Sequence, residues 1–174
     1  MYNKIMQYLN MGFWYVLRAI PLGLALNILI NLIKRNQSTK KMFLLNTFFY
    51  TYCIAILNIT GILGMTFNFS YFKHAFENLQ LPFTNPSLLM LLLNVGLFIP
   101  FGFLLSLLVP KCRKIHMILI ISLLFTIVIE FLQAFSGRMT ELDDVIMNTI
   151  GGIVGYIIWK CYDKYLKNRK YEKV

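Results

Sequence analysis

The sequence predicts an all-α membrane protein, a bundle of about five transmembrane helices with an interfacial helix between the second and third spans. Two observations lead to this fold class. Mean hydropathy is +0.64 and only 14% of the residues are charged, about half the share found in soluble domains. The apolar residues also come in runs of about twenty, the length at which a helix crosses a bilayer.

The basic residues set the expected orientation. The net charge of +10 could indicate nucleic-acid binding, but Lys and Arg cluster between the apolar runs and after the last one. That is the pattern of cytoplasmic loops, so we expect no nucleic-acid partner. The first link, the third link and the C-terminal tail are basic, whereas the other loops hold one basic residue each. Five spans with the N-terminus outside and the C-terminus in the cytoplasm satisfy this pattern.

The first two spans are expected at about 13–33 and 42–65. The first is too long for a signal-peptide core and no small-residue cleavage site follows it. Gly23, Asn27 and Asn31 recur every four residues and therefore share one helix face. We favour helix packing as their role over a functional one.

The link at 66–87 differs from the others because it is long, aromatic and almost uncharged. Phe69, Phe72, Phe76 and Leu79 have helical spacing. The pattern predicts a short amphipathic helix in the interface, with its aromatic rings at headgroup depth.

The third span is expected at about 88–109. Pro100 lacks a backbone donor and should kink this helix near the middle of the membrane. Gly102 and Ser106 form a small-xxx-small pair that favours close helix packing.

The fourth span, about 115–135, carries its polar residues on one face. Ser122, Thr126, Glu130, Gln133 and Gly137 step by four, four, three and four. The fifth span, about 143–159, likewise has one polar and small face, formed by Asp144, Asn148, Gly151 or Gly152, and Gly155. The Gly151-xxx-Gly155 pair should let another helix approach closely.

These faces predict a shared polar site. A charge in the hydrocarbon is disfavoured by roughly 2.5–3.5 kcal/mol, so such residues usually face a bundle interior or a cavity. The helical rise places Glu130 roughly 7–8 Å below the outer surface. Asn94 and Asn148 also fall in the outer halves of their helices, and Asp144 begins its helix at the outer boundary. We therefore expect these side chains to meet in a pocket under that surface.

The charges at this site leave alternatives open. Glu130 needs a partner or a proton, and both Arg138 and Arg18 are candidate ion-pair partners at suitable depths. Asp143 and Asp144 could simply cap a helix N-terminus. The oxygen ligands lack the spacing of a metal site and the three cysteines have no CxxC motif, so we expect no metal and no cofactor.

Two blocks of the chain resemble the VanZ-like family of small bacterial membrane proteins. Residues 94–102, Asn-Val-Gly-Leu-Phe-Ile-Pro-Phe-Gly, are similar to the family's N-x3-F-x-P-x-G pattern. The second block comprises Glu130, Gln133, Arg138, Asp143, Asp144, Asn148, Gly151 and Gly155. The resemblance implies a single VanZ-like domain over residues 1–174 in a bacterial cytoplasmic membrane, with its core at 88–159 and a basic tail at 160–174.

The resemblance also implies a function, because the family is named for a protein that gives low-level resistance to teicoplanin-type lipoglycopeptides. It implies that the matching polar residues, Asn94, Glu130, Gln133, Arg138, Asp143, Asp144 and Asn148, form the functional set. Pro100, Gly102, Gly151 and Gly155 would serve helix geometry. No catalytic assignment comes with the motif.

Three functions are then open. The favoured one is a non-enzymatic resistance or envelope protein that binds a lipid-like molecule or lipid-tailed antibiotic at the outer leaflet. The second is a membrane enzyme that modifies a lipid-linked envelope component, with Glu130 or Asp144 as general acid or base. The absence of a Ser-His-Asp set or an HExxH motif counts against it. The third is a structural bundle or a subunit of a larger assembly, whose protein partner the sequence does not identify.

Overall fold

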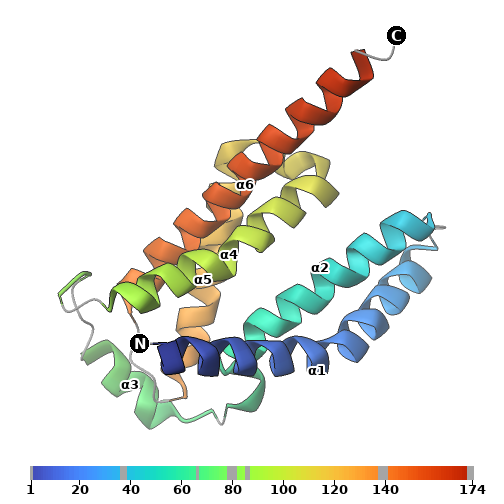
Figure 1. The fold of residues 1–174 in the computed structure, drawn as a ribbon. Helices are drawn as coiled ribbons and strands as arrows, with labels where there is room; N and C mark the ends of the chain where they lie inside the picture. Colours follow the sequence, from blue (N-terminus) through green and yellow to red (C-terminus); the bar gives the residue numbers. More distant parts are fainter. Residues whose placement is uncertain are drawn as a thin grey trace. The chain divides into compact units, whose positions relative to one another are not determined.

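The computed structural model describes residues 2–35, 39–65, 67–77, 82–84, 87–136 and 141–171. Over these ranges its elements are helices, in the order α1 (Tyr2–Lys34), α2 (Lys40–Ile59), η1 (Ile62–Gly64), α3 (Phe69–Glu77), α4 (Leu88–Leu108), η2 (Pro110–Cys112), α5 (Ile115–Ala134) and α6 (Leu142–Tyr171) (Figure 1). Helices α1, α2, α4, α5 and α6 are long and apolar enough to cross a membrane. The predicted all-α class with five spans is therefore confirmed.

The chain forms two compact units, Met1–Asn68 and Phe69–Val174. In the first, α1 and α2 form a helical hairpin. A Cβ added at Gly23 would lie 2.2 Å from Thr51 Oγ1, so the two backbones are close. One turn further, Asn27 Nδ2 donates to the Phe43 carbonyl at 2.9 Å and to Thr47 Oγ1 at 2.8 Å. The four-residue repeat in α1 therefore serves packing, as predicted.

The helix boundaries in this unit differ from the sequence prediction for local reasons. α2 ends at Ile59, before the predicted residue 65. Gly61 has φ +80°, a left-handed conformation that commonly ends a helix. Figure 1 shows α1 changing direction along its length, and Pro21 lies inside it. A proline within a helix removes one backbone hydrogen bond and is a common cause of such bends.

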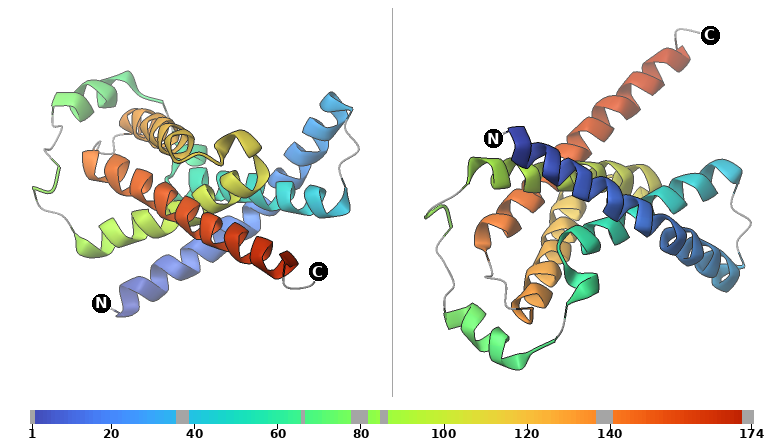
Figure 2. Two further views of the ribbon diagram at one scale, coloured as in Figure 1. Left: turned by 90° about the horizontal axis from the view of Figure 1, so that it is seen from above. Right: turned by 60° about the horizontal axis from the view of Figure 1, so that its bottom comes forward.

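In the second unit α6 lies along α4, and α5 packs against α6 (Figure 2). Glycines make the contact between α4 and α6 close. A Cβ added at Gly102, Gly151 or Gly155 would lie 2.0, 2.3 or 2.1 Å from a backbone carbonyl oxygen of the facing helix. No side chain fits at such distances, so the two helices can pack this closely only because these positions are glycine. α4 continues through Pro100, and the predicted kink there stays a prediction.

Helix α3 confirms the predicted short helix after the second span. Its phenylalanines pack on the C-terminal end of α5: the rings of Phe72 and Phe135 stack at 4.5 Å, and Phe69 meets Phe135 edge-on at 5.5 Å. The predicted position of Leu79 lies outside the described residues, and the position of α3 in the membrane interface stays a prediction.

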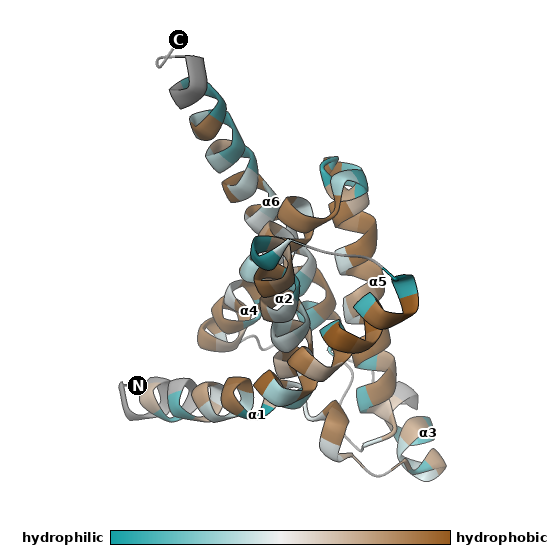
Figure 3. Ribbon diagram, turned by 90° about the vertical axis from the view of Figure 1, so that its right-hand side faces the viewer, coloured by the Kyte–Doolittle hydropathy of each residue, from teal (hydrophilic) through white to brown (hydrophobic). Residues whose placement is uncertain are grey.

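Helix α6 continues well past its predicted end at 159 and takes up most of the basic tail. Lys167 Nζ and Asp163 Oδ2, one turn apart, form an ion pair at 2.6 Å, a spacing that supports a helix by a few tenths of a kcal/mol, about 0.2–0.5. Figure 3 shows the change of character along this helix, from apolar colours to hydrophilic ones toward its C-terminal part.

The exposed and buried residues of α5 are those of a membrane helix. Leu124 and Val128 are 57% and 52% exposed, whereas Ser122 and Thr126 are fully buried. Exposed apolar surface of this extent is unfavourable in water but is covered by lipid in a bilayer. The polar side chains of α5 from Ser122 to Gln133 therefore lie inside the second unit.

Candidate functional site

The buried face of α5 supplies the first part of the site. Ser122, Thr126, Glu130 and Gln133 are each at most 7% exposed. Their steps of four, four and three residues place them along one side of the helix. This is the side that packs in the interior of the second unit, as the sequence predicts.

Two side-chain hydrogen bonds join α4, α5 and α6 at this level. Asn148 of α6 is 4% exposed, and its Nδ2 donates to Thr126 Oγ1 at 2.9 Å. One turn earlier in α6, Asp144 Oδ1 accepts a hydrogen bond from Asn94 Nδ2 of α4. A buried hydrogen bond contributes about 0.5–1.5 kcal/mol, and one to a charged group about 1.5–3 kcal/mol. The pairs therefore fix the register of the three helices as well as the position of a carboxylate.

Glu130 lies one turn from Thr126 and is 4% exposed. Its Oε2 accepts from the backbone N–H of Glu141, just before α6, at 3.3 Å. A carboxylate buried in this way is stabilised by donors that point at it. Hydrogen bonds between helices, and single helical turns within them, thus connect five residues in series: Glu130, Thr126, Asn148, Asp144 and Asn94.

The interior also contains a polar atom without a partner. Among the described residues, Asn148 Oδ1 is a buried acceptor that receives no hydrogen bond. Such an atom costs about 1–3 kcal/mol relative to a satisfied one. The amide nitrogen of Asn148 donates to Thr126, so its oxygen is the atom of this side chain that can still accept a hydrogen bond.

Ser122 Oγ is the second buried side-chain oxygen without a hydrogen bond in the described part of the chain. It lies against Gly152, where an added Cβ would be 2.1 Å from it. The hydroxyl therefore fills the space that the missing glycine side chain leaves, and it serves the contact between α5 and α6.

Asp143, in the first turn of α6, makes a contact that its position in the sequence does not indicate. Its Oδ1 accepts from the backbone N–H of Phe83 at 2.7 Å. Phe83 has φ +62°, a left-handed conformation that costs a non-glycine residue about 1 kcal/mol or more. Asp143 therefore holds the segment 82–84 at the start of α6, a contact that the sequence interpretation as a helix cap does not include.

The structure thus brings four of the predicted residues together, Asn94, Glu130, Asp144 and Asn148, with Gln133 on the same face of α5. The predicted set of functional residues did not include Thr126, although its four-residue spacing to Glu130 placed it on the same helix face.

The remaining predictions lie elsewhere. Arg138 is outside the described residues. Arg18 is an exposed residue of α1, in the first unit, and its pairing with Glu130 stays a prediction. Within the described residues no group of three or more His, Cys, Asp or Glu side chains could hold a metal ion.

Five helices that are long and apolar enough to cross a bilayer define a multi-pass membrane protein. The model of the VanZ/LLP1 family matches residues 49–163, well over half of the chain. The chain belongs to the VanZ/LLP1 family. It is 36% identical to Protein VanZ of Enterococcus faecium over 84 residues, which are 47% of this chain and 50% of that protein. The chain therefore spans half the length of this relative, and no solved structure matches it.

Proposed function

We propose that this VanZ-type membrane protein contributes to resistance against teicoplanin-type lipoglycopeptides by binding a lipid-like molecule, or the lipid-tailed antibiotic itself, at the outer leaflet. The ligand's polar part would enter the cluster formed by Asn94, Thr126, Glu130, Asp144 and Asn148. The family supports the resistance role. The observation that carries the binding role is the buried, unpartnered Asn148 Oδ1, set among carboxylates in a membrane-embedded bundle.

The chemistry of the cluster indicates the kind of group that it would take. Glu130 and Asp144 carry acceptor oxygens, as does the open side of Asn148. A ligand rich in N–H or O–H donors, or one with an amine, would donate to these oxygens in a low dielectric, where hydrogen bonds to charged groups are strong. The phenylalanines of α3 and α5, of which Phe69 is 80% exposed, would contact the acyl part.

Resistance is expected to be selective for the lipid-tailed drug. A susceptible host that expresses the protein should need more teicoplanin for inhibition than the empty-vector host, whereas the inhibitory concentration of vancomycin should change little, because vancomycin lacks an acyl tail to occupy the apolar surface. Broth dilution with both drugs measures this. Equal teicoplanin values with and without the protein, at verified expression, would contradict the resistance role.

The proposal also includes an orientation, with the N-terminus outside and the C-terminus in the cytoplasm, supported by the basic links and tail. In a Cys53→Ala background, a membrane-impermeant maleimide should label the exposed Cys161 in inside-out vesicles and leave it unlabelled in intact cells.

Cys112, in η2, provides an internal comparison in the same vesicles. It is 3% exposed, and burial raises the pKa of its thiol. A raised pKa lowers the thiolate fraction at a given pH, so the labelling of Cys112 should be slow and should become faster only at a pH above the usual range of thiol pKa values.

For the orientation itself, labelling of Cys161 from outside the cell would be the contradicting result.

A further inference from the structure

One end of the second unit concentrates positive charge. The link between α4 and α5 carries Lys111, Arg113 and Lys114, and the C-terminal part of α6 carries Lys160, Lys164 and Lys167. All six are exposed, and we call them the basic end. Asp163 is the one acid in the segments 110–116 and 160–168, and its carboxylate is paired with Lys167. The six like charges therefore repel one another with little internal compensation.

The basic end is held together by contacts between the link and α6. The Arg113 guanidinium lies over the Trp159 ring, 5.7 Å from its centroid. Tyr156, one turn earlier in α6, donates from its hydroxyl to the Arg113 carbonyl at 3.5 Å. Trp159 and Tyr156 are both buried. These contacts fix the basic link against α6, so the charges of the two segments lie at one end of the unit.

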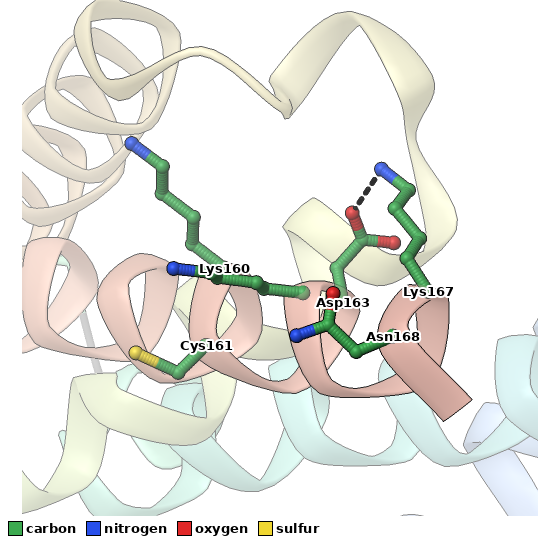
Figure 4. Close-up of a pocket in the computed structure, with 6 residues that line it drawn as sticks. Lys160, Cys161, Asp163, Lys167 and Asn168 are labelled. Atoms are coloured by element: carbon green, nitrogen blue, oxygen red, sulfur yellow. Dashed lines mark hydrogen bonds and ion pairs between the residues drawn. The ribbon is translucent and has the colours of Figure 1, made fainter. Parts of the chain in front are cut away.

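This end also has hollows that polar groups could fill. One, of about 530 Å³, is lined by Lys160, Cys161, Asp163, Lys164, Lys167 and Asn168 (Figure 4). Its volume falls within the range of small-molecule sites, roughly 300–1,000 Å³. A second hollow is lined by Pro110, Lys111, Lys114, His116 and Met117. Both hollows are lined by lysines, and the one acid among their lining residues, Asp163, is paired with Lys167, which favours an anionic occupant.

The sequence of exposed side chains along α6 places the lysines at the level of phospholipid headgroups. Ile157 and Ile158 are 50% and 45% exposed, as expected of residues facing hydrocarbon, and Tyr162 and Tyr165 are 44% and 55% exposed. Exposed tyrosines are typical of the membrane interface. Lys160 lies two residues after Ile158, and at 1.5 Å per residue Lys167 lies only about 10 Å further on. The anion within reach is therefore the phosphate of a lipid.

We propose that the basic end is a binding site for anionic phospholipids, in which the lysines of α6 and the basic link hold the headgroup phosphate. Basic pockets between membrane helices are suited to this chemistry, and each basic residue near an anionic surface contributes about 1 kcal/mol. This site is separate from the polar cluster and does not depend on the resistance role.

The chain provides its own reporter for a test. It has two tryptophans, so the Trp14→Phe variant leaves Trp159, beside Arg113 of the basic end, as the sole tryptophan, which can be excited selectively over tyrosine. The full-length variant is reconstituted in vesicles in which either phosphatidylglycerol or phosphatidylcholine carries brominated acyl chains, which quench a nearby tryptophan over a short distance. We expect quenching to show roughly threefold or greater preference for phosphatidylglycerol, reduced by salt. Equal quenching by the two lipids would overturn the site.

Three further variants in the Trp14→Phe background separate a site from general charge effects. The variant K160Q/K164Q/K167Q should lose the preference, and K160R/K164R/K167R should retain it. The variant K34Q/K40Q/K41Q removes the same charge from the first unit and should also retain the preference. If the first and third variants lose it equally, the attraction is nonspecific and the proposal fails.

Discussion

Gly102→Ala is expected to destabilise the second unit by about 1–3 kcal/mol, the cost of overpacking a tight interior, and to reduce the amount of folded protein in the membrane. The added Cβ would lie 2.0 Å from the carbonyl oxygen of Gly152. A backbone atom cannot rotate away as a side chain can, so α4 and α6 would have to separate. Thermal unfolding monitored by size-exclusion chromatography in detergent measures the effect as a lower melting temperature.

Gly96 provides the matched control on the same helix. A Cβ at this position has nothing within 4 Å, and the residue is exposed. Gly96→Ala makes the same chemical change and should be neutral, or stabilising by up to about 1 kcal/mol because alanine is the better helix former. Equal melting temperatures for the two variants would show that the close contact between α4 and α6 does not govern stability.

The glycines show where sequence reasoning succeeds and where it ends. The Gly151-xxx-Gly155 spacing predicts close approach to a neighbouring helix because residues four apart share a face. The spacing does not identify the neighbour. The neighbours depend on how three helices pack: Gly102 of α4 faces Gly152, and Ser122 of α5 contacts the same glycine.

The polar site, too, could be predicted from the sequence only in part. The buried face of α5 follows from periodicity, because a carboxylate such as Glu130 is disfavoured in lipid and must turn inward. The pairing of Asn94 with Asp144, fifty residues apart, is a tertiary contact that no local pattern contains. For Asp143 the sequence left a helix cap and a functional role open, because local rules alone can explain an acid at a helix start. Its contact with Phe83 depends on a left-handed backbone that the sequence does not indicate.

The fold class was predictable because the bilayer restricts the choices. A chain in lipid must satisfy its backbone hydrogen bonds internally, so apolar runs of about twenty residues become helices. The extent of α6 was not predictable from hydropathy, because its last turns are rich in basic residues. The 2.6 Å pair of Asp163 and Lys167 is one local contact that supports these turns.

Asp144→Asn is expected to abolish the teicoplanin phenotype while the protein still accumulates in the membrane. The asparagine oxygen can accept from Asn94 as the carboxylate does, so the link between α4 and α6 is retained. The substitution removes the negative charge. A ligand's hydrogen bond to a charged group is stronger than one to a neutral group, and the lost free energy should weaken binding about tenfold. The inhibitory concentration of teicoplanin should fall to that of the empty-vector host, with membrane abundance measured by immunoblot as the control.

The exchange N94D/D144N separates a binding role from a structural one. It returns one carboxylate and one amide to the same contact, with the carboxylate now on α4, so a ligand that needs a negative charge at this level should regain at least part of its binding. If the pair is purely structural, Asp144→Asn should retain full function, because it keeps the hydrogen bond to Asn94. The exchange variant would then have no loss of function to restore. Full resistance in Asp144→Asn at normal abundance would therefore refute the binding proposal, and parallel loss of abundance and resistance in both variants would assign the pair to folding.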